Sequence, residues 1–259
     1  MLSPGELHVW RVRLDMLDED ALIPAAPSEV ARAARFHSAE VRTRYLRSHR
    51  ALRSILAGIT SAPLDFAMAE NGKPFLAAAP EIHFNLSHSR DMALVGVALG
   101  VEVGVDIELL RPIPEHAAIA ERFFPPSEAE ALAAVPEAKR ERDFFRRWTR
   151  IEAMLKARGV GLYGAGSEAD GDWTVLPVEV GPEYSAAVAA GCAGMTLRVR
   201  RFAAGPSVVN ILKPAERSIH NVPPAYSRWV RRTRSYSTQR RSRGSASGVF
   251  DIGRHACPV

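Results

Sequence analysis

The amino-acid sequence predicts an α+β fold built from two halves that meet near Gly100. Segments with helical periodicity and segments with strand periodicity alternate, but without the regular strand–helix–strand order of a parallel sheet. The expected strands follow one another closely, as the strands of hairpins do. We therefore expect an N-terminal α+β half over residues 1–100, a C-terminal α+β half over 101–213, and a basic tail over 214–259.

The first half begins with a segment whose apolar and polar residues alternate, which is typical of a strand. Ser28 can cap a helix that starts near Glu29, and a longer helix rich in arginine follows it. We expect those arginines mostly to face water or an anion. The Asn-Gly-Lys-Pro sequence at 71–74 is a turn signal. The expected elements are a strand at 6–14, a helix from about 29, a helix over about 39–57, and strands at 82–86 and 92–98.

The second half starts where Gly100 turns the chain into a further strand. Two prolines precede a helical segment, and Ser127 with Glu130 resembles the capping box of a second short helix. A longer helix follows and ends at Gly159, as helices often do at glycine. The expected elements are a strand at 101–108, a helix to about 124, a short helix from about 127, a helix at 137–158, and strands at 173–180, 185–190 and 195–202.

Charge and composition separate the tail from the rest of the chain. Residues 214–259 hold nine arginines and two acids, a net charge of +7 that leaves −2 for residues 1–213. The tail is rich in Arg, Ser and Gly and lacks apolar periodicity, so we interpret it as disordered and solvated. Charge patterning favours a solvated appendage over a nucleic-acid partner, which the basic tail leaves as an alternative.

Location follows from what the sequence lacks. No stretch approaches the roughly 20 apolar residues that a membrane span needs, and the N-terminus does not resemble a secretory signal. Only two cysteines occur, far apart, at 192 and 257. A disulfide framework or cysteine metal site is therefore not expected, which favours the reducing cytoplasm.

Two acids stand out in the strand sequence VGVDIE. Asp106 and Glu108 are two residues apart, so strand geometry places both carboxylates on the same side. Carboxylate oxygens suit Mg²⁺, which commonly takes one or two of them and completes its shell with water and phosphate. Taken alone, such a pair is more often a strand edge with solvated acids.

The helix over 137–158 carries an apolar stripe, with Glu152 and Lys156 expected along its margin. Taken alone, these two residues form a generic stabilising pair, worth about 0.2–0.5 kcal/mol. The stripe consists of Phe144, Trp148, Ile151 and Leu155, at helical spacing.

A polar cluster is expected to end the strand at 82–86. Its hydroxyl, imidazole and amide groups can hold a phosphate, or they can form a satisfied turn. Its members are Asn85, Ser87, His88 and Ser89. The sequence contains no P-loop, Rossmann glycine fingerprint or G-x-S-x-G elbow, which argues against common nucleotide-binding and serine-hydrolase folds.

Four motifs together resemble the 4'-phosphopantetheinyl transferases, in particular the larger, two-subdomain type that activates peptide and polyketide synthetases. In order, they are NGKPFL, FNLSHS, GVDIE and W-T-x-x-E-A-x-x-K-A-x-G-x-G-L, within residues 6–202. The resemblance implies two pseudo-twofold-related subdomains, with coenzyme A in the cleft between them, in a monomer. It also implies transfer of phosphopantetheine from coenzyme A to a serine of an apo acyl or peptidyl carrier protein.

The resemblance also assigns roles to residues of this chain. Asp106, Glu108 and Glu152 would bind Mg²⁺ with the pyrophosphate. Glu152 would also serve as general base, and Lys156 would neutralise the leaving group. The residues implied in coenzyme A binding are Arg32, Gly72, Lys73, Pro74, Asn85, Ser87 and His88.

One position departs from the family pattern. The family has lysine immediately before the metal-binding glutamate, whereas this chain has Ile151. A cation beside the site is thereby lost. This leaves open an alternative, a coenzyme A-binding homologue with impaired catalysis.

Overall fold

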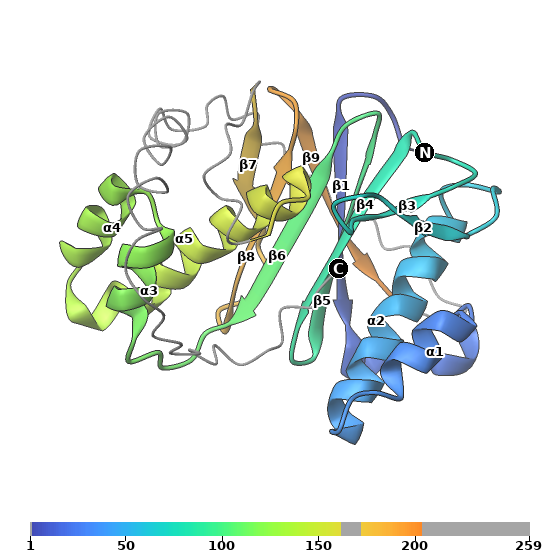
Figure 1. The fold of residues 1–259 in the computed structure, drawn as a ribbon, viewed down its shortest axis with the longest axis horizontal. Helices are drawn as coiled ribbons and strands as arrows, with labels where there is room; N and C mark the ends of the chain where they lie inside the picture. Colours follow the sequence, from blue (N-terminus) through green and yellow to red (C-terminus); the bar gives the residue numbers. More distant parts are fainter. Residues whose placement is uncertain (1, 162–171, 204–259) are drawn as a thin grey trace, which may run out of the picture.

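Two sheets lie side by side, with helices at the outer side of each, in the computed structural model of the chain (Figure 1). The structure describes residues 2–161 and 172–203. The tail predicted at 214–259 lies outside them. The elements of the first half are β1 (Glu6–Arg13), two short 3-10 helices (Leu14–Met16 and Glu19–Ala21), α1 (Pro27–Ala33), α2 (Ala39–Ala57), β2 (Phe66–Met68), β3 (Pro74–Leu76), β4 (Ile82–Ser89) and β5 (Met92–Leu99).

The second half continues with one more sheet and three more helices. These elements are β6 (Val103–Leu109), α3 (His116–Phe123), α4 (Pro126–Ala133), α5 (Glu137–Arg158), β7 (Thr174–Pro177), β8 (Tyr184–Ala190) and β9 (Thr196–Phe202). The α+β class predicted from the sequence is confirmed. No helix within the described ranges combines the length and apolar character that crossing a membrane requires.

The strand order explains how the two halves join. One sheet has the order β4-β5-β1-β9, and a second has the order β6-β8-β7, while β2 and β3 form a separate hairpin. Strand β9 comes from the second half of the sequence, yet it pairs in parallel with β1. Gly100 turns the chain between the sheets with a φ of 67°. The division of the chain at this glycine remains a prediction.

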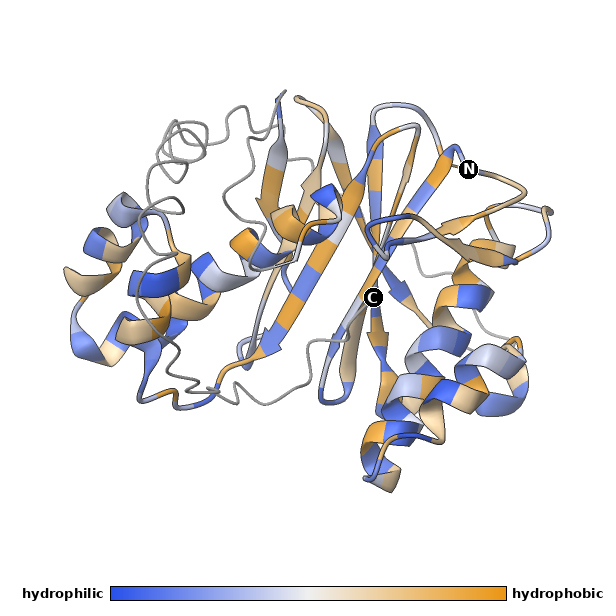
Figure 2. Ribbon diagram, in the orientation of Figure 1, coloured by the Kyte–Doolittle hydropathy of each residue, from blue (hydrophilic) through white to orange (hydrophobic). Residues whose placement is uncertain are grey.

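Three apolar clusters fill the spaces between the layers. One packs α2 against the first sheet, one lies between the two sheets, and one packs α3 to α5 against the second sheet. Hydrophobic and hydrophilic residues alternate along β6 (Figure 2). Its residues Val103, Val105 and Ile107 face the central cluster. Because side chains alternate along a strand, the intervening Gly104, Asp106 and Glu108 face α5.

Gly104 allows α5 to lie unusually close to β6. A Cβ atom at this position would be 2.1 Å from the carbonyl oxygen of Ala153 and 2.2 Å from the backbone nitrogen of Ala157. Alanines of β8 line the same interface, and Ala187 and Ala189 are fully buried there. Small residues thus let the helix backbone approach the sheet and bring its side chains to the acids of β6.

Two predicted helix caps are wrong. Helix α1 begins at Pro27, and its first turn is closed by the Glu29 carboxylate, which accepts a hydrogen bond of 2.7 Å from the Ala26 amide. Ser28 therefore lies inside the helix. Helix α4 begins at Pro126 after Pro125, and no side chain caps it, so Ser127 and Glu130 form no capping box. In both cases a proline at the start of the helix fixes the boundary.

Four of the five arginines of α2 pair with carboxylates of the protein, so the prediction that they mostly face water or an anion is wrong, although Arg42 is exposed. Arg47 and Arg50 both pair with Glu19, while Arg53 is buried and pairs with Glu29 at 2.8 Å. Arg44 pairs with Asp91 at 2.9 Å. These ion pairs fasten α2 to the segments around it.

Candidate functional site

The acids of β6 form the centre of the site. Asp106 is 4% exposed, and Glu108 is partly buried beside it. Both carboxylates face α5, as the alternation along the strand predicts. A buried acid needs compensation by a cation or by hydrogen bonds, because burial disfavours its charged form.

Helix α5 supplies that compensation. The Lys156 ammonium donates hydrogen bonds to Oδ1 of Asp106, at 2.7 Å, and to Oγ of Ser87, at 3.1 Å. Glu152 lies one turn earlier and is also buried. The sequence placed these two residues along the margin of the apolar stripe, but they face β6 inside the protein. The close approach at Gly104 is the reason.

Strand β4 holds the acids from the other side. It extends three residues beyond the predicted end, to Ser89, and lies beside β6. Ser87 donates to Oδ1 of Asp106 at 3.1 Å, and Ser89 donates to Oε2 of Glu108 at 3.2 Å. Asn85 accepts a hydrogen bond of 2.9 Å from the Val105 amide. These polar side chains therefore position β6, whereas the sequence suggested a phosphate site at a strand end.

The electrostatics of the cluster favour an additional cation. Burial raises the pKa of Glu152 to about 7, with repulsion from Asp106 and Glu108 adding to the rise against the opposing effect of Lys156. Burial and the Asp106 carboxylate also raise the pKa of Glu108. Burial alone would lower the pKa of Lys156, but the charges of Asp106 and Glu152 outweigh it and raise that pKa. The three acids outnumber Lys156 and Arg111, the two cations that pair with them.

One oxygen in the cluster has no partner. Oδ2 of Asp106 is buried and makes no hydrogen bond, although burial of an unpaired polar atom is costly. Among the residues described, no three His, Cys, Asp or Glu side chains stand close enough together to hold a metal ion as they are. The Lys156 ammonium already occupies one oxygen of Asp106.

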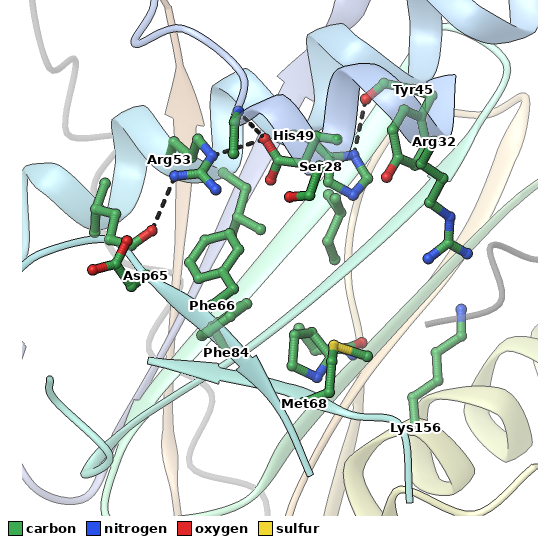
Figure 3. A pocket seen from close by; sticks show the side chains of 17 residues that line it. Ser28, Arg32, Tyr45, His49, Arg53, Asp65, Phe66, Met68, Phe84 and Lys156 are labelled. Carbon is green, nitrogen blue, oxygen red and sulfur yellow. Dashed lines mark hydrogen bonds and ion pairs between the residues drawn. The ribbon is translucent and has the colours of Figure 1, made fainter. Parts of the chain in front are cut away.

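A cavity of about 460 Å³ adjoins this cluster (Figure 3). Its lining comes from α1, α2, the β2–β3 hairpin and β4, with Lys156 as the contribution of α5. In Figure 3, Arg32 from α1 and Lys156 extend toward each other across one end of it. Phe66 and Phe84 line another part, with ring centroids 5.0 Å apart. The cavity thus combines a cationic end with an aromatic part.

Two lining residues on α2 were missed from the sequence. The rings of Tyr45 and His49 have centroids 3.9 Å apart and are tilted by 33°, and His49 Nδ1 donates to the Tyr45 carbonyl at 2.9 Å. Burial lowers the pKa of His49, so its ring is neutral at pH 7. The spacing of Tyr45, His49 and Arg53, four residues apart each time, is the signal that could have placed them on one face of the helix.

Other predicted binding residues lie apart from the cavity. The Lys73 ammonium donates to the Glu102 carboxylate and to the carbonyls of Val103, at 3.0 Å, and Ala157, at 2.8 Å. These three contacts use all its hydrogens, so Lys73 ties β3 to β6 and α5, and its arrangement does not support direct phosphate contact. Burial lowers the pKa of Lys73.

The remaining predicted residues divide between the cavity and other positions. Pro74 lines the cavity, and Asn85 lines it as well. Gly72 has a φ of 81°, which its turn requires. His88 alternates with Ser87 and Ser89 along β4, so it faces the opposite side of the strand. Ser87 reaches the cavity only indirectly, through Lys156.

Known proteins resemble parts of this chain. A family model for the 4'-phosphopantetheinyl transferase superfamily matches residues 102–183, which include the four acidic and basic residues of the cluster. The 4'-phosphopantetheinyl transferase HetI of Nostoc sp. is 39% identical over 170 residues, covering 62% of this chain and 72% of HetI.

Two further relatives match shorter parts. The 4'-phosphopantetheinyl transferase psf-1 of Bacillus pumilus is 40% identical over 120 residues, which cover 45% of this chain and 50% of psf-1. The 4'-phosphopantetheinyl transferase Sfp of Bacillus subtilis is 29% identical over 140 residues, which cover 53% of this chain and 61% of Sfp. The chain therefore spans half to three fifths of the length of these two relatives.

Proposed function

Because the chain belongs to the 4'-phosphopantetheinyl transferase superfamily, we propose that it transfers the 4'-phosphopantetheine arm of coenzyme A to a serine of an apo acyl or peptidyl carrier protein. The other product is adenosine 3',5'-bisphosphate. The observation that carries this proposal is the buried cluster of Asp106, Glu108, Glu152 and Lys156, which Lys156 connects to the cavity.

The cavity has the size and chemistry for the nucleotide part of coenzyme A. Ligand pockets commonly measure about 300–1,000 Å³, and this one measures about 460 Å³. The aromatic part near Phe66 suits a flat base. At the opposite end, Arg32 suits the 3'-phosphate, because a guanidinium binds phosphate oxygens through two parallel hydrogen bonds.

The chemistry of the acids suits a magnesium ion, although the side chains must come closer together than they stand in this structure to hold it. Oδ2 of Asp106 lacks a partner, Glu152 holds a raised pKa, and hard carboxylate oxygens are the ligands that Mg²⁺ prefers. Asp106, Glu108 and Glu152 would hold the ion. When bound, Mg²⁺ supplies positive charge against the pyrophosphate oxygens.

The chain's own groups account for the movement of charge and proton. The carrier serine oxygen forms a bond to the β-phosphorus of coenzyme A, and the bond from that phosphorus to the bridging oxygen breaks. Lys156 neutralises the charge that develops on the leaving bisphosphate. Glu152 takes the serine proton, as the general base of the reaction.

The alternative of a coenzyme A-binding homologue with impaired catalysis has no observation in its favour. It rests on Ile151, where the family has lysine. Ile151 is 4% exposed and packs in the apolar cluster of α5 with Phe144 and Trp148. Isoleucine is thus suited to this position, while Lys156 supplies a cation to the acids.

Magnesium dependence, a monomeric state and a cytoplasmic location remain parts of this proposal. One chain contributes every residue of the cluster and the cavity, which is consistent with a monomer. The scarcity of cysteine supports the location. Nucleic acid is not proposed as a partner, since the argument for it comes only from the tail.

Intact-mass spectrometry of an apo carrier protein tests the function. The carrier is incubated with the protein, coenzyme A and Mg²⁺, and we expect a mass gain of one phosphopantetheine group. A carrier whose acceptor serine is replaced by alanine is the control and should gain no mass. Absence of any gain on acyl and peptidyl carriers alike would contradict the proposal.

A further inference from the structure

Ser89 makes two hydrogen bonds that join β4 to the end of β6. Its Oγ donates to Oε2 of Glu108 at 3.2 Å and accepts from the Leu109 amide at 3.1 Å. The backbone contact fixes where the hydroxyl lies. The side-chain contact then fixes where one oxygen of Glu108 lies. The hydroxyl therefore holds the Glu108 carboxylate at a fixed position relative to the Leu109 backbone.

A second donor reaches the same oxygen. Arg111 Nη1 lies 3.1 Å from Oε2 of Glu108 and 3.2 Å from the Leu109 carbonyl. The Arg111 guanidinium also lies over the Phe145 ring, at 5.4 Å from its centroid. Both donors bind Oε2, which leaves Oε1 as the oxygen of Glu108 for a cation.

The same arrangement repeats two residues earlier. Ser87 and Ser89 are two residues apart on β4, as Asp106 and Glu108 are on β6, and each serine donates to one carboxylate. On Asp106 the serine holds Oδ1, and Oδ2 has no partner. In both acids the protein thus holds one carboxylate oxygen, and the other oxygen is left for a cation.

We propose that Ser89 is a positioning residue for the transfer reaction, because its hydroxyl holds Oε2 of Glu108 and so presents Oε1 to the magnesium ion. This inference rests on the proposed function, which supplies the ion. Ser89 touches neither substrate nor ion itself. Groups that hydrogen-bond a metal-ligating carboxylate typically contribute about 10- to 100-fold to metal affinity.

Ser89→Ala tests the inference through Mg²⁺ binding rather than through activity alone. Isothermal titration measures Mg²⁺ binding to the full chain saturated with coenzyme A, without a carrier protein. We expect affinity to fall about tenfold, the lower end of that range, because Arg111 still holds Oε2. Ser89→Thr retains the hydroxyl in a strand that tolerates β-branched residues, and it should restore binding.

Ser54 offers a matched control. Its Oγ accepts from the Ile23 amide at 3.0 Å and donates to the Arg50 carbonyl at 2.9 Å. Ser54→Ala therefore also leaves a backbone amide without its acceptor. It lies on α2, away from the acids of β6. Both alanine variants should show similar decreases in the melting temperature, but Ser54→Ala should bind Mg²⁺ like the parent.

The outcomes separate this inference from the proposed function. Parental Mg²⁺ affinity in Ser89→Ala, the same loss in Ser54→Ala, or no recovery in Ser89→Thr would each overturn the role of Ser89. If Ser89→Ala does not fold, Ser89→Cys keeps the shape with a weaker donor, and parental affinity there would overturn it. A parent protein that binds Mg²⁺ but modifies no carrier contradicts the proposed function. In that case the Mg²⁺ titrations of the variants still test the role of Ser89. A parent that binds no Mg²⁺ overturns the role of Ser89 and the metal assignment, while carrier modification still decides the proposed function.

Discussion

Replacing Gly104 by alanine tests whether the close approach of α5 to β6 builds the site. The added Cβ would lie 2.1 Å from the Ala153 carbonyl oxygen, where real Cβ contacts are essentially never under 3.0 Å. The helix must therefore retreat by about 1 Å, since backbone atoms cannot rotate away. Such overpacking typically costs about 1–3 kcal/mol, and we expect the upper end, about 3 kcal/mol.

The displacement should also impair transfer. Lys156 lies on the retreating helix, 2.7 Å from Oδ1 of Asp106. A shift of about 1 Å weakens this hydrogen bond, and misplacement on that scale can lower a rate by about 100-fold. Urea unfolding, followed by tryptophan fluorescence, and intact-mass transfer assays measure the two effects.

Gly96→Ala is the matched control for this substitution. Its Cβ would lie 2.7 Å from Cγ1 of Val105, the end of a side chain that can adjust. We expect a loss of about 1 kcal/mol, with the transfer rate near that of the parent. Parental stability and rate in Gly104→Ala would refute the argument that this glycine sets the geometry of the cluster.

Three further predictions concern charge at the site. The folded protein holds a proton on Glu152 up to a pKa of about 7, against 4.5 unfolded, so metal-free protein should lose about 3 kcal/mol of stability between these pH values. Urea unfolding at pH 5 and pH 8 should show a larger loss in the parent than in Glu152→Gln, where only the raised pKa of Glu108 remains, and equal losses would contradict it. Arg32→Ala should weaken coenzyme A binding by about tenfold or more, because a charge-assisted hydrogen bond is lost. The affinity for dephospho-coenzyme A, measured by the same titration, should hardly change. Equal weakening of both ligands would rule out the 3'-phosphate contact. Ile151→Lys would bury a charge in the apolar cluster and should cost about 3 kcal/mol or more in urea unfolding, and a variant as stable as the parent would refute this.

The sequence predicted the fold where local pattern and packing agree. The helix at 39–57 was predicted with its observed bounds, and so was the helix at 137–158 that ends at Gly159. Alternation along β6 correctly placed Asp106 and Glu108 on one side. It could not show that α5 covers that side, because the decisive feature is the contact of Gly104 with residues some 50 positions later.

The same limit applies to single side chains. Lys73 belongs to a motif that implies phosphate binding, yet its three acceptors come from segments distant in sequence. Ile151 suggested from the sequence that a cation beside the site is missing. Its burial at 4% exposure agrees with its place in the apolar stripe and puts it in the core. A pattern gives the face of an element, but the partner on that face depends on the tertiary fold.

The measurement that tests the central claim most directly is carrier modification by Asp106→Ala. Oδ1 of Asp106 accepts hydrogen bonds from Lys156 and Ser87, and its unpartnered Oδ2 is the oxygen assigned to Mg²⁺. Folding should survive, because Glu152 and Glu108 still balance the charge of Lys156 after its pair with Asp106 is lost. Intact-mass spectrometry with coenzyme A and Mg²⁺ should then show at least a 100-fold slower gain of phosphopantetheine than with the parent, since charge stabilisation of this kind contributes roughly 10²–10³ to a rate. Transfer near the parental rate would contradict the assignment of this cluster as the reaction centre.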